Sequence, residues 1–410
     1  MTYTVRRSNS IPRRRLQSTV LALAIVLLEA LLATPTAQGQ TLTVLHSFKG
    51  GGDGTNPLAG LIRDGKGSLY GTSQLGGAFN YGTVFKLDAT GKYTLLYSFT
   101  GGADGGYPFG GVIRDAGGNL YGTSLAGGSV RACNNGFGCG TVFKLDRRGI
   151  ETVLYNFTGA TDGASPQASL IQDANGNLYG TTATGGVGCG SLGCGTVFKL
   201  DPTGTESVLY SFTGAADGRS PYGGLVRDAK GNIYGTTYTG GDLNCFSLGC
   251  GTLFKLDAAG TEIVLHSFTD GADGGYPFDA LVPNGENLFG TTQTGGAFGH
   301  GTVFRLDKTG KQTVLYSFAG SPDGASPVAA LIHDAAGTLY GTTQNGGAFN
   351  DGTVFKLDTT GEETVLHSFT GAADGKSPDA ALIRDAGGNL YGTTYGGGAF
   401  GFGTVFKIAP

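Results

Sequence analysis

An aspartate recurs seven times along this 410-residue chain, each time within the pattern D-G-x-x-P. The seven copies are Asp53, Asp104, Asp162, Asp217, Asp273, Asp323 and Asp374. A ring of carboxylates could bind Ca²⁺, but each copy offers one carboxylate and Ca²⁺ takes about six to eight oxygen ligands. An Asp-Gly turn before a proline explains the same pattern without an ion. We therefore expect turns here, and no metal or cofactor.

The better candidates for a binding site are positions that differ between otherwise similar copies. Two such positions follow G-T-T (or G-T-S) and the proline of D-G-x-x-P. Aromatic, amide and acidic side chains there suit stacking and hydrogen bonding to sugars or peptides, although ordinary loop decoration would also explain them. The candidate ligand-binding residues are Gln74, Tyr222, Tyr238, Asp279, Gln293, His300, Gln344, Asp379 and Tyr395.

Catalysis has fewer candidates. Asp279 and Asp379 could act as an acid and base pair if they met across an axis. Of the five histidines, His300 alone is expected beside them, because the others fall on a strand or near tight turns. No G-x-S-x-G or H-E-x-x-H motif is present. An extracellular lyase, glycosidase or lactonase is therefore the alternative to a binding module, and we assign no catalytic residue.

The candidates belong to seven copies of one repeat. The Tyr or Phe of the motif L-Y-G-T marks each copy, at Tyr70, Tyr121, Tyr179, Tyr234, Phe289, Tyr340 and Tyr391. Each copy holds four short β-type runs, which we call A to D. Tight D-x-x-G turns link A to B and C to D, as expected between antiparallel neighbours. The longer B–C and D–A links should share one rim and carry the binding site.

Both faces of these runs are partly apolar, which favours sheets packed on both sides. The sequence predicts an all-β, seven-bladed β-propeller of four-stranded antiparallel blades over residues 41–410. A glycine stands at the centre of run B in every copy, as at Gly71. Because glycine weakens a strand, we attribute it to close backbone approach between blades.

The first and last copies are each incomplete. The repeat region opens with a run D, T-V-L-H-S-F, and its last copy ends with run C, G-T-V-F-K-I. We therefore expect the N-terminal strand, residues 42–48, to join the last blade and close the ring, which removes exposed sheet edges. An open solenoid is the alternative, but it would need atypical repeats at its ends.

Six cysteines lie in the lengthened B–C links of copies two, three and four. They form three local pairs, Cys133 with Cys139, Cys189 with Cys194 and Cys245 with Cys250. In an exported protein such pairs favour disulfides. A zinc site is the alternative, although it would need cysteines from separate loops to converge without C-x2-C spacing.

The N-terminal segment, residues 1–39, has arginines before an apolar run and then small residues, as in a secretory signal peptide. A retained membrane anchor is the alternative; the run is short and contains Glu29. Without this segment the chain holds 22 basic and 30 acidic residues. We therefore expect no nucleic-acid partner and no stable membrane span after signal cleavage.

The run G-N-L-Y-G-T-T, followed by G-T-V-F-K-L-D and T-V-L-Y-S-F, closely resembles the GloVer (Gloeobacter and Verrucomicrobia) tandem repeat of exported bacterial proteins. The resemblance covers residues 41–410. It implies secretion and, in many members, a C-terminal anchoring signal, which we do not expect here because the chain ends at Pro410. It supplies no catalytic motif. We expect a monomer, secreted or in the periplasm or cell envelope, that binds a polysaccharide or another exported protein.

Overall fold

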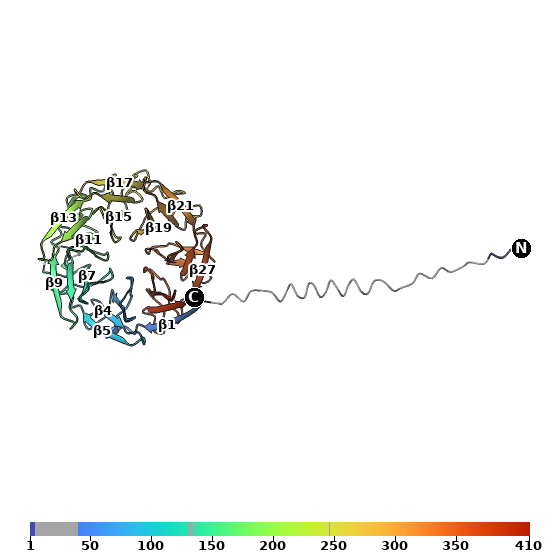
Figure 1. Cartoon of the computed structure of the whole chain (residues 1–410), viewed down its shortest axis with the longest axis horizontal. Helices are drawn as coiled ribbons and strands as arrows, with labels where there is room; N and C mark the ends of the chain where they lie inside the picture. Colours follow the sequence, from blue (N-terminus) through green and yellow to red (C-terminus); the bar gives the residue numbers. More distant parts are fainter. Residues whose placement is uncertain (5–39, 130–132, 134–135, 246) are drawn as a thin grey trace. The chain divides into compact units, whose positions relative to one another are not determined.

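The computed structural model describes residues 1–4 and 40–410, except 130–132, 134, 135 and 246. The predicted signal peptide, residues 1–39, falls almost wholly outside the described residues. Within residues 41–410, seven four-stranded antiparallel sheets form a ring, and Figure 1 shows the sheets following one another around an axis in chain order. The protein is a seven-bladed β-propeller, as predicted. No helix among the described residues is long and apolar enough to cross a membrane.

The strands of each blade are named A to D, and Figure 1 shows D strands such as β9 and β13 on the outer circumference. Blade one comprises β2 (Ile62–Arg63), β3 (Leu69–Ser73), β4 (Thr83–Leu87) and β5 (Tyr93–Ser98). Blade two comprises β6 (Ile113–Arg114), β7 (Leu120–Ser124), β8 (Thr141–Leu145) and β9 (Glu151–Asn156). Blade three comprises β10 (Ile171–Gln172), β11 (Leu178–Thr182), β12 (Thr196–Leu200) and β13 (Glu206–Ser211). Blade four comprises β14 (Val226–Arg227), β15 (Ile233–Thr237), β16 (Thr252–Leu256) and β17 (Glu262–Ser267).

The remaining three blades follow the same order. Blade five comprises β18 (Val282–Asn284), β19 (Asn287–Thr292), β20 (Thr302–Leu306) and β21 (Gln312–Ser317). Blade six comprises β23 (Ile332–His333), β24 (Leu339–Thr343), β26 (Thr353–Leu357) and β27 (Glu363–Ser368). Blade seven comprises β28 (Ile383–Arg384), β29 (Leu390–Thr394), β30 (Thr404–Ala409) and β1 (Thr41–Ser47). The links contain the short elements η1 (Gly51–Asp53), η3 (Gly190–Leu192), β22 (Gly324–Ala325) and β25 (Asn345–Gly346).

The ring is closed as the sequence predicts. β1 pairs antiparallel with β30, from Thr41 opposite Ala409 to Ser47 opposite Thr404. In Figure 1 the blue β1 lies beside the red C-terminal strands. The closing strand begins at Thr41 and ends at Ser47, close to the expected 42–48. Both ends of the repeat region are therefore held in one sheet.

One pair of phenylalanines packs at each of the seven interfaces between blades. The phenylalanine that follows strand D contacts the phenylalanine in strand C of the next blade, with ring centroids 5.1–5.4 Å apart. Phe212 and Phe254, for example, are fully buried. Burial of such rings supplies much of the packing energy between neighbouring sheets. The core is thus a ring of seven similar clusters rather than one central cluster.

The glycine at the centre of strand B has a different reason from the one expected. A Cβ on Gly71 would lie 2.7 Å from Cζ of Phe85 and 2.8 Å from Cδ2 of Leu61, two side chains of its own blade. The other six strand-B glycines meet the same pair of positions. The glycine therefore leaves room for side chains within the blade, and not for the backbone of a neighbouring blade.

Candidate ligand site at the axis

The D–A links of all seven blades contribute to one cavity of about 280 Å³. The residue after the D–A proline lines it in every blade: Leu58, Phe109, Gln167, Tyr222, Phe278, Val328 and Asp379. A cavity that touches all seven links must lie on the axis of the ring. Its wall also includes Asp279 and, from the B–C links, Gln293 and Gln344. The predicted rim therefore does form a concave site.

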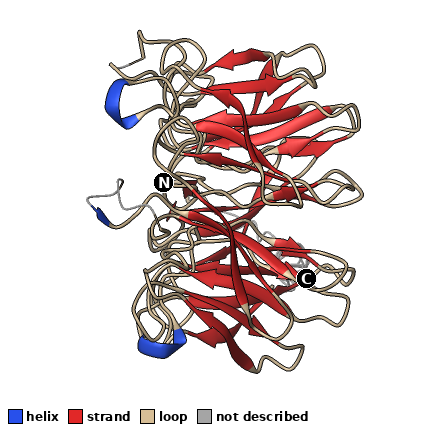
Figure 2. Ribbon diagram, turned by 90° about the vertical axis from the view of Figure 1, so that its left-hand side faces the viewer, coloured by secondary structure: helices blue, strands red, loops and turns tan. Residues whose placement is uncertain are grey.

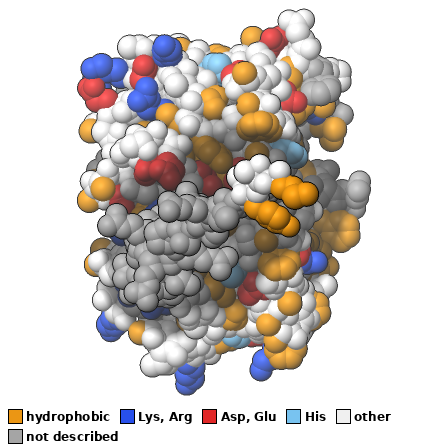
Figure 3. Space-filling model, turned by 90° about the vertical axis from the view of Figure 1, so that its right-hand side faces the viewer, with side chains coloured by type: hydrophobic (Ala, Val, Ile, Leu, Met, Phe, Trp, Pro, Cys, Tyr) orange, Lys and Arg blue, Asp and Glu red, His pale blue; other side chains and the backbone are white. Residues whose placement is uncertain are grey.

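The links that build this site lie at one edge of the ring. Figure 2 shows the helical turns, blue, among the loops at the left-hand edge; η1 belongs to a D–A link and η3 to a B–C link. Where described residues are visible in Figure 3, basic and acidic side chains lie interspersed.

Asp279 is held by backbone donors at the axis. Its Oδ1 accepts a hydrogen bond from the N–H of Ala280 at 2.7 Å, and its Oδ2 accepts one from Ala330, in the next blade, at 2.9 Å. Burial raises the pKa of this carboxyl, although the N–H groups of Ala280, Ala330 and Gly224 work against the rise. The side chain thus bridges blades four, five and six.

Asp379 occupies the axial wall in blade seven and is less well satisfied. Burial raises the pKa of its carboxyl to about 7, and a hydrogen bond from the side chain of Gln344 partly opposes this rise. Its Oδ1 is buried and has no hydrogen-bond partner among the described residues. An acid of this kind can change its protonation state near neutral pH.

Aromatic side chains flank the acidic ones. Tyr222 lies 5.4 Å from Phe278 and 5.3 Å from Tyr238, measured between ring centroids. Tyr238 is not a lining residue; its hydroxyl donates to Oε1 of Gln293 at 2.9 Å and so holds that amide at the cavity wall. The wall therefore combines flat apolar surfaces with oriented polar groups, the composition of a typical small-ligand site.

Five of the nine predicted site residues line the cavity: Tyr222, Asp279, Gln293, Gln344 and Asp379. Tyr238 does not line the cavity but holds the lining residue Gln293 through a hydrogen bond. Gln74, His300 and Tyr395 lie outside the cavity wall. His300 is exposed and packs by its ring against Gly320, where a Cβ would be 3.0 Å from Nε2. The structure therefore brings Asp279 and Asp379 to one cavity without His300.

Sequence reasoning missed other parts of the wall. Phe109, Gln167 and Phe278 were not among the candidates, although each follows the proline of its own D–A link as Tyr222 does, and that predicted position was the available signal. The axial backbone N–H groups had no signal in the sequence, because their direction depends on the folded link.

The D-G aspartates are used within their own links. Oδ2 of Asp104 accepts hydrogen bonds from the hydroxyl of Tyr97 at 3.0 Å and from the N–H of Thr100 at 2.8 Å. In three links a histidine replaces the tyrosine: the pairs are His46 with Asp53, His266 with Asp273 and His367 with Asp374, at 3.0–3.1 Å. These contacts match the turn interpretation of D-G-x-x-P.

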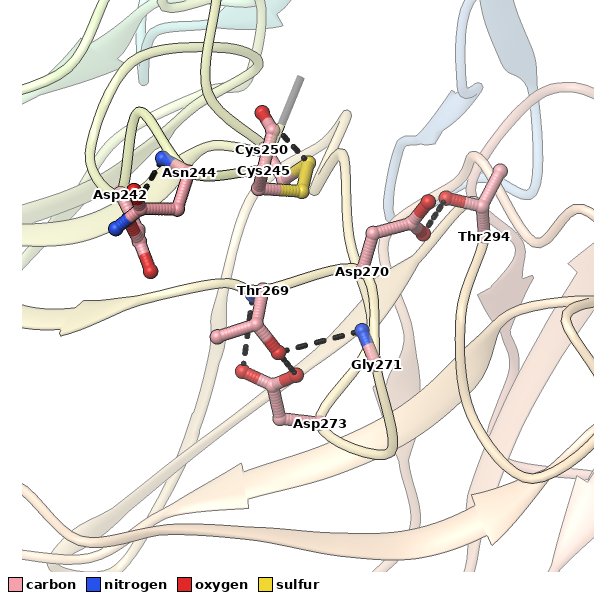
Figure 4. The surroundings of a disulfide bond; sticks show 9 residues. All are labelled: Asp242, Asn244, Cys245, Cys250, Thr269, Asp270, Gly271, Asp273 and Thr294. Carbon is pink, nitrogen blue, oxygen red and sulfur yellow. Dashed lines mark hydrogen bonds between the residues drawn. A yellow bond between two sulfur atoms is a disulfide. The ribbon is translucent and has the colours of Figure 1, made fainter.

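The three cysteine pairs form disulfides: Cys133–Cys139, Cys189–Cys194 and Cys245–Cys250, with Cα atoms 4.8, 5.3 and 5.7 Å apart. Figure 4 shows the third beside the D–A link that contains Asp270 and Asp273. The first two contact the glycine of the following link, since a Cβ on Gly159 or Gly214 would lie 2.2 Å from a cysteine sulfur. These two disulfides therefore pack against the start of the next D–A link.

The comparisons with known proteins agree with this fold. Virginiamycin B lyase from Staphylococcus aureus superposes over 90% of this chain and 99% of its own, with 12% identity and a TM-score of 0.59. The extracellular domain of BT4673 from B. thetaiotaomicron superposes over 90% of this chain and 41% of its own, with 14% identity and a TM-score of 0.55. At such identities the likeness concerns the fold alone.

No curated protein matches the sequence. A family model does match, in two overlapping stretches, residues 32–249 and 187–406, and its description is the Gloeobacter/Verrucomicrobia repeat. Together these stretches cover nearly the whole ring. The chain belongs to the Gloeobacter/Verrucomicrobia repeat family.

Proposed function

We propose that this protein is an exported binding module that takes a glycan at the axial cavity of its B–C/D–A rim. The observation that carries the proposal is the convergence of all seven D–A links on one cavity. Tyr222, Phe109 and Phe278 offer ring faces to sugars, and Gln293 and Gln344 offer amides to hydroxyl groups. The blades themselves are near-identical, so the variable wall is where selection for a ligand would act.

Export is part of the same proposal. Three disulfides within short loops are typical of proteins that fold in an oxidising compartment. The arginine-rich and apolar residues 1–39 would direct the chain out of the cytoplasm. We place the working protein in the periplasm, in the cell envelope or outside the cell, as a monomer.

The test is retention on a panel of insoluble polysaccharides, with soluble products assayed in the same tubes. We expect the affinity behind this retention to fall by roughly fivefold to thirtyfold in Tyr222→Ala, because loss of a stacking ring removes about 1–2 kcal/mol. Phe349→Ala is the matched control, since that ring is 59% exposed on the same rim and does not line the cavity. Equal retention of both variants would remove the axial cavity from the proposal.

A second candidate function is a lyase, glycosidase or lactonase. One observation favours it: Asp379 is an acid with a pKa of about 7 in the wall of a cavity, the range that suits general acid–base work. Soluble products in the retention assay that vanish in Asp379→Asn would establish it. Products that persist in that variant would remove Asp379 as the acid.

A further inference from the structure

Seven peptide groups around the axis share one orientation. In each, the carbonyl accepts a hydrogen bond at 3.0–3.3 Å from the strand-B threonine of the preceding blade. In blade one, for example, the carbonyl of Ala59 accepts from Thr393, and in blade seven that of Ala380 accepts from Thr342. The carbonyls are therefore all fixed toward the body of the ring.

The N–H groups of the same peptides must point the other way, because N–H and C=O are antiparallel across a trans peptide. Three of them show this directly. The N–H of Gly111 donates to Oγ of Ser169 at 2.9 Å, and those of Ala280 and Ala330 donate to the carboxylate of Asp279. The axis is thus surrounded by backbone donors, and the carboxyl group of Asp279 already occupies one side of that ring.

On the opposite side of the axis, backbone N–H groups lack an acceptor among the described residues. The N–H groups of Gly60, Ser169 and Ala381 have no hydrogen-bond acceptor among the described residues, and all three residues line the cavity. Gly60 and Ala381 are neighbours, since a Cβ on Gly60 would lie 3.3 Å from O and 3.8 Å from N of Ala381. Adjacent unused N–H groups in a concave wall form a site for an anion.

Asp379 lies in the same wall as these donors, in the link that contains Ala381. Its Oδ1 has no partner among the described residues and almost no accessible surface, so this oxygen meets a ligand only when the side chain turns toward the cavity. A carboxyl group that keeps its proton can donate to an anion, whereas a carboxylate there would repel one. The pKa of about 7 allows the protonated form in mildly acidic and neutral solution.

We propose that the axial cavity binds the carboxylate of a uronic acid unit in an acidic glycan, held by the N–H groups of Gly60 and Ala381 and by the carboxyl of Asp379. This inference rests on the proposed glycan-binding function and names the ligand class. The sugar ring of that unit packs against the aromatic wall formed by Phe109, Tyr222 and Phe278. On the other side of the axis, the N–H groups of Ala280 and Ala330 already donate to the two oxygens of the Asp279 carboxyl group.

The proposed carboxylate site predicts how the affinity for a uronate changes with pH. The titratable residues of the wall are Asp279, Asp379 and Tyr222. A uronate stays ionised above pH 5, so the proton on Asp379 controls binding. Affinity should fall as pH rises through about 7, by roughly tenfold for each pH unit above it. A cationic amino sugar drawn to the two aspartates would instead bind more tightly at pH 7 than at pH 5.5, as Asp379 ionises, and would weaken again at pH 8.5, where its own amine loses the proton.

The experiment is calorimetric titration of the purified protein at pH 5.5, 7 and 8.5. The three ligands are the trisaccharide of galacturonic acid, the methyl ester of that trisaccharide and the trisaccharide of glucosamine. We expect the acid to bind best, and to weaken at least tenfold between pH 7 and 8.5. Asp379→Asn should bind the acid nearly equally at all three values, because an amide donates at any pH. Phe349→Ala, outside the cavity, should behave like the unaltered protein.

The other outcomes separate the two proposals. Equal affinity for the acid and its methyl ester would overturn the carboxylate site and leave glycan binding standing. Binding of glucosamine that is tighter at pH 7 than at pH 5.5, and tighter than that of the acid, would overturn the carboxylate site in favour of a cation site. No binding of any trisaccharide, together with no retention on polysaccharides, would remove the proposed function itself. Loss of binding in Asp379→Asn at pH 5.5 would show that the amide cannot replace the acid and would also overturn the inference.

Discussion

The side-chain amide of Gln312 donates a hydrogen bond to the backbone carbonyl of Asp273 at 3.2 Å, tying the outer strand of blade five to the link that leads into that blade. In blade one the hydroxyl of Tyr93 makes the same contact with the carbonyl of Asp53 at 2.7 Å. Four blades have a glutamate at this position: Glu151, Glu206, Glu262 and Glu363. A glutamate can make the contact only as the protonated acid.

These four glutamates should make the ring less stable as pH rises. Burial, and secondarily the D-G aspartate of the same link, raises the pKa of each from 4.5 to about 7. Between these two values the folded protein holds protons that the unfolded chain releases, so the free energy of unfolding falls through pH 4.5–7. Because the sites are only partly buried, we expect roughly 1 kcal/mol each. Thermal unfolding followed by circular dichroism at pH 5 and pH 8 checks this; a higher midpoint at pH 8 would contradict it.

Exchange of glutamine and glutamate between blades isolates the effect. Glu206→Gln should raise the free energy of unfolding at pH 8 by about 1 kcal/mol and change it little at pH 5, because it reproduces the contact of Gln312. The reciprocal Gln312→Glu should lower stability at pH 8 by a similar amount. The measurement is urea unfolding at both pH values. If both variants changed the free energy of unfolding at pH 8 in the same direction, the charge at this position would not be what determines stability.

The paired phenylalanines should dominate the stability of the ring. Phe212→Ala removes a fully buried ring that packs 5.1 Å from Phe254, so we expect a loss of about 3–5 kcal/mol. Phe349→Ala is the control, because its ring is exposed and surface changes usually cost less than about 0.5 kcal/mol. Denaturant unfolding of both proteins distinguishes them. Equal losses would mean that the blades are not held by these pairs.

The strand-B glycine should tolerate no side chain. Gly71→Ala places a Cβ 2.7 Å from Phe85 and should cost about 1–3 kcal/mol through overpacking. Gly65→Ala is the control, because nothing lies within 4 Å of its Cβ and its backbone is not in the left-handed region. That change should leave the thermal midpoint unchanged or slightly raised. A neutral Gly71→Ala would show that Phe85 can move aside.

The repeats made the architecture predictable from the sequence. Seven copies with the same turn chemistry define the blades, and the two incomplete copies define the closure between β1 and β30. The symmetry of the repeats also predicted the site. Residues at one position of all the D–A links had to lie around the axis, as Tyr222 and Asp379 do. The B–C residues were less predictable, because Gln293 reaches the cavity whereas Gln74, at the same position in the repeat, does not. Their side-chain directions depend on neighbours such as Tyr238.

The pairing that closes the ring also determines how the molecule would respond to mechanical load. Thr41 lies opposite Ala409, so the two ends of the propeller leave the same end of one antiparallel strand pair. Tension applied through both ends would break the cross-strand hydrogen bonds one after another, as a zipper opens, instead of loading them all in shear. Tension applied through one end alone would not pull directly across this pairing. The strand pair that closes the ring is therefore in its weakest geometry when tension acts through both ends of the propeller at once.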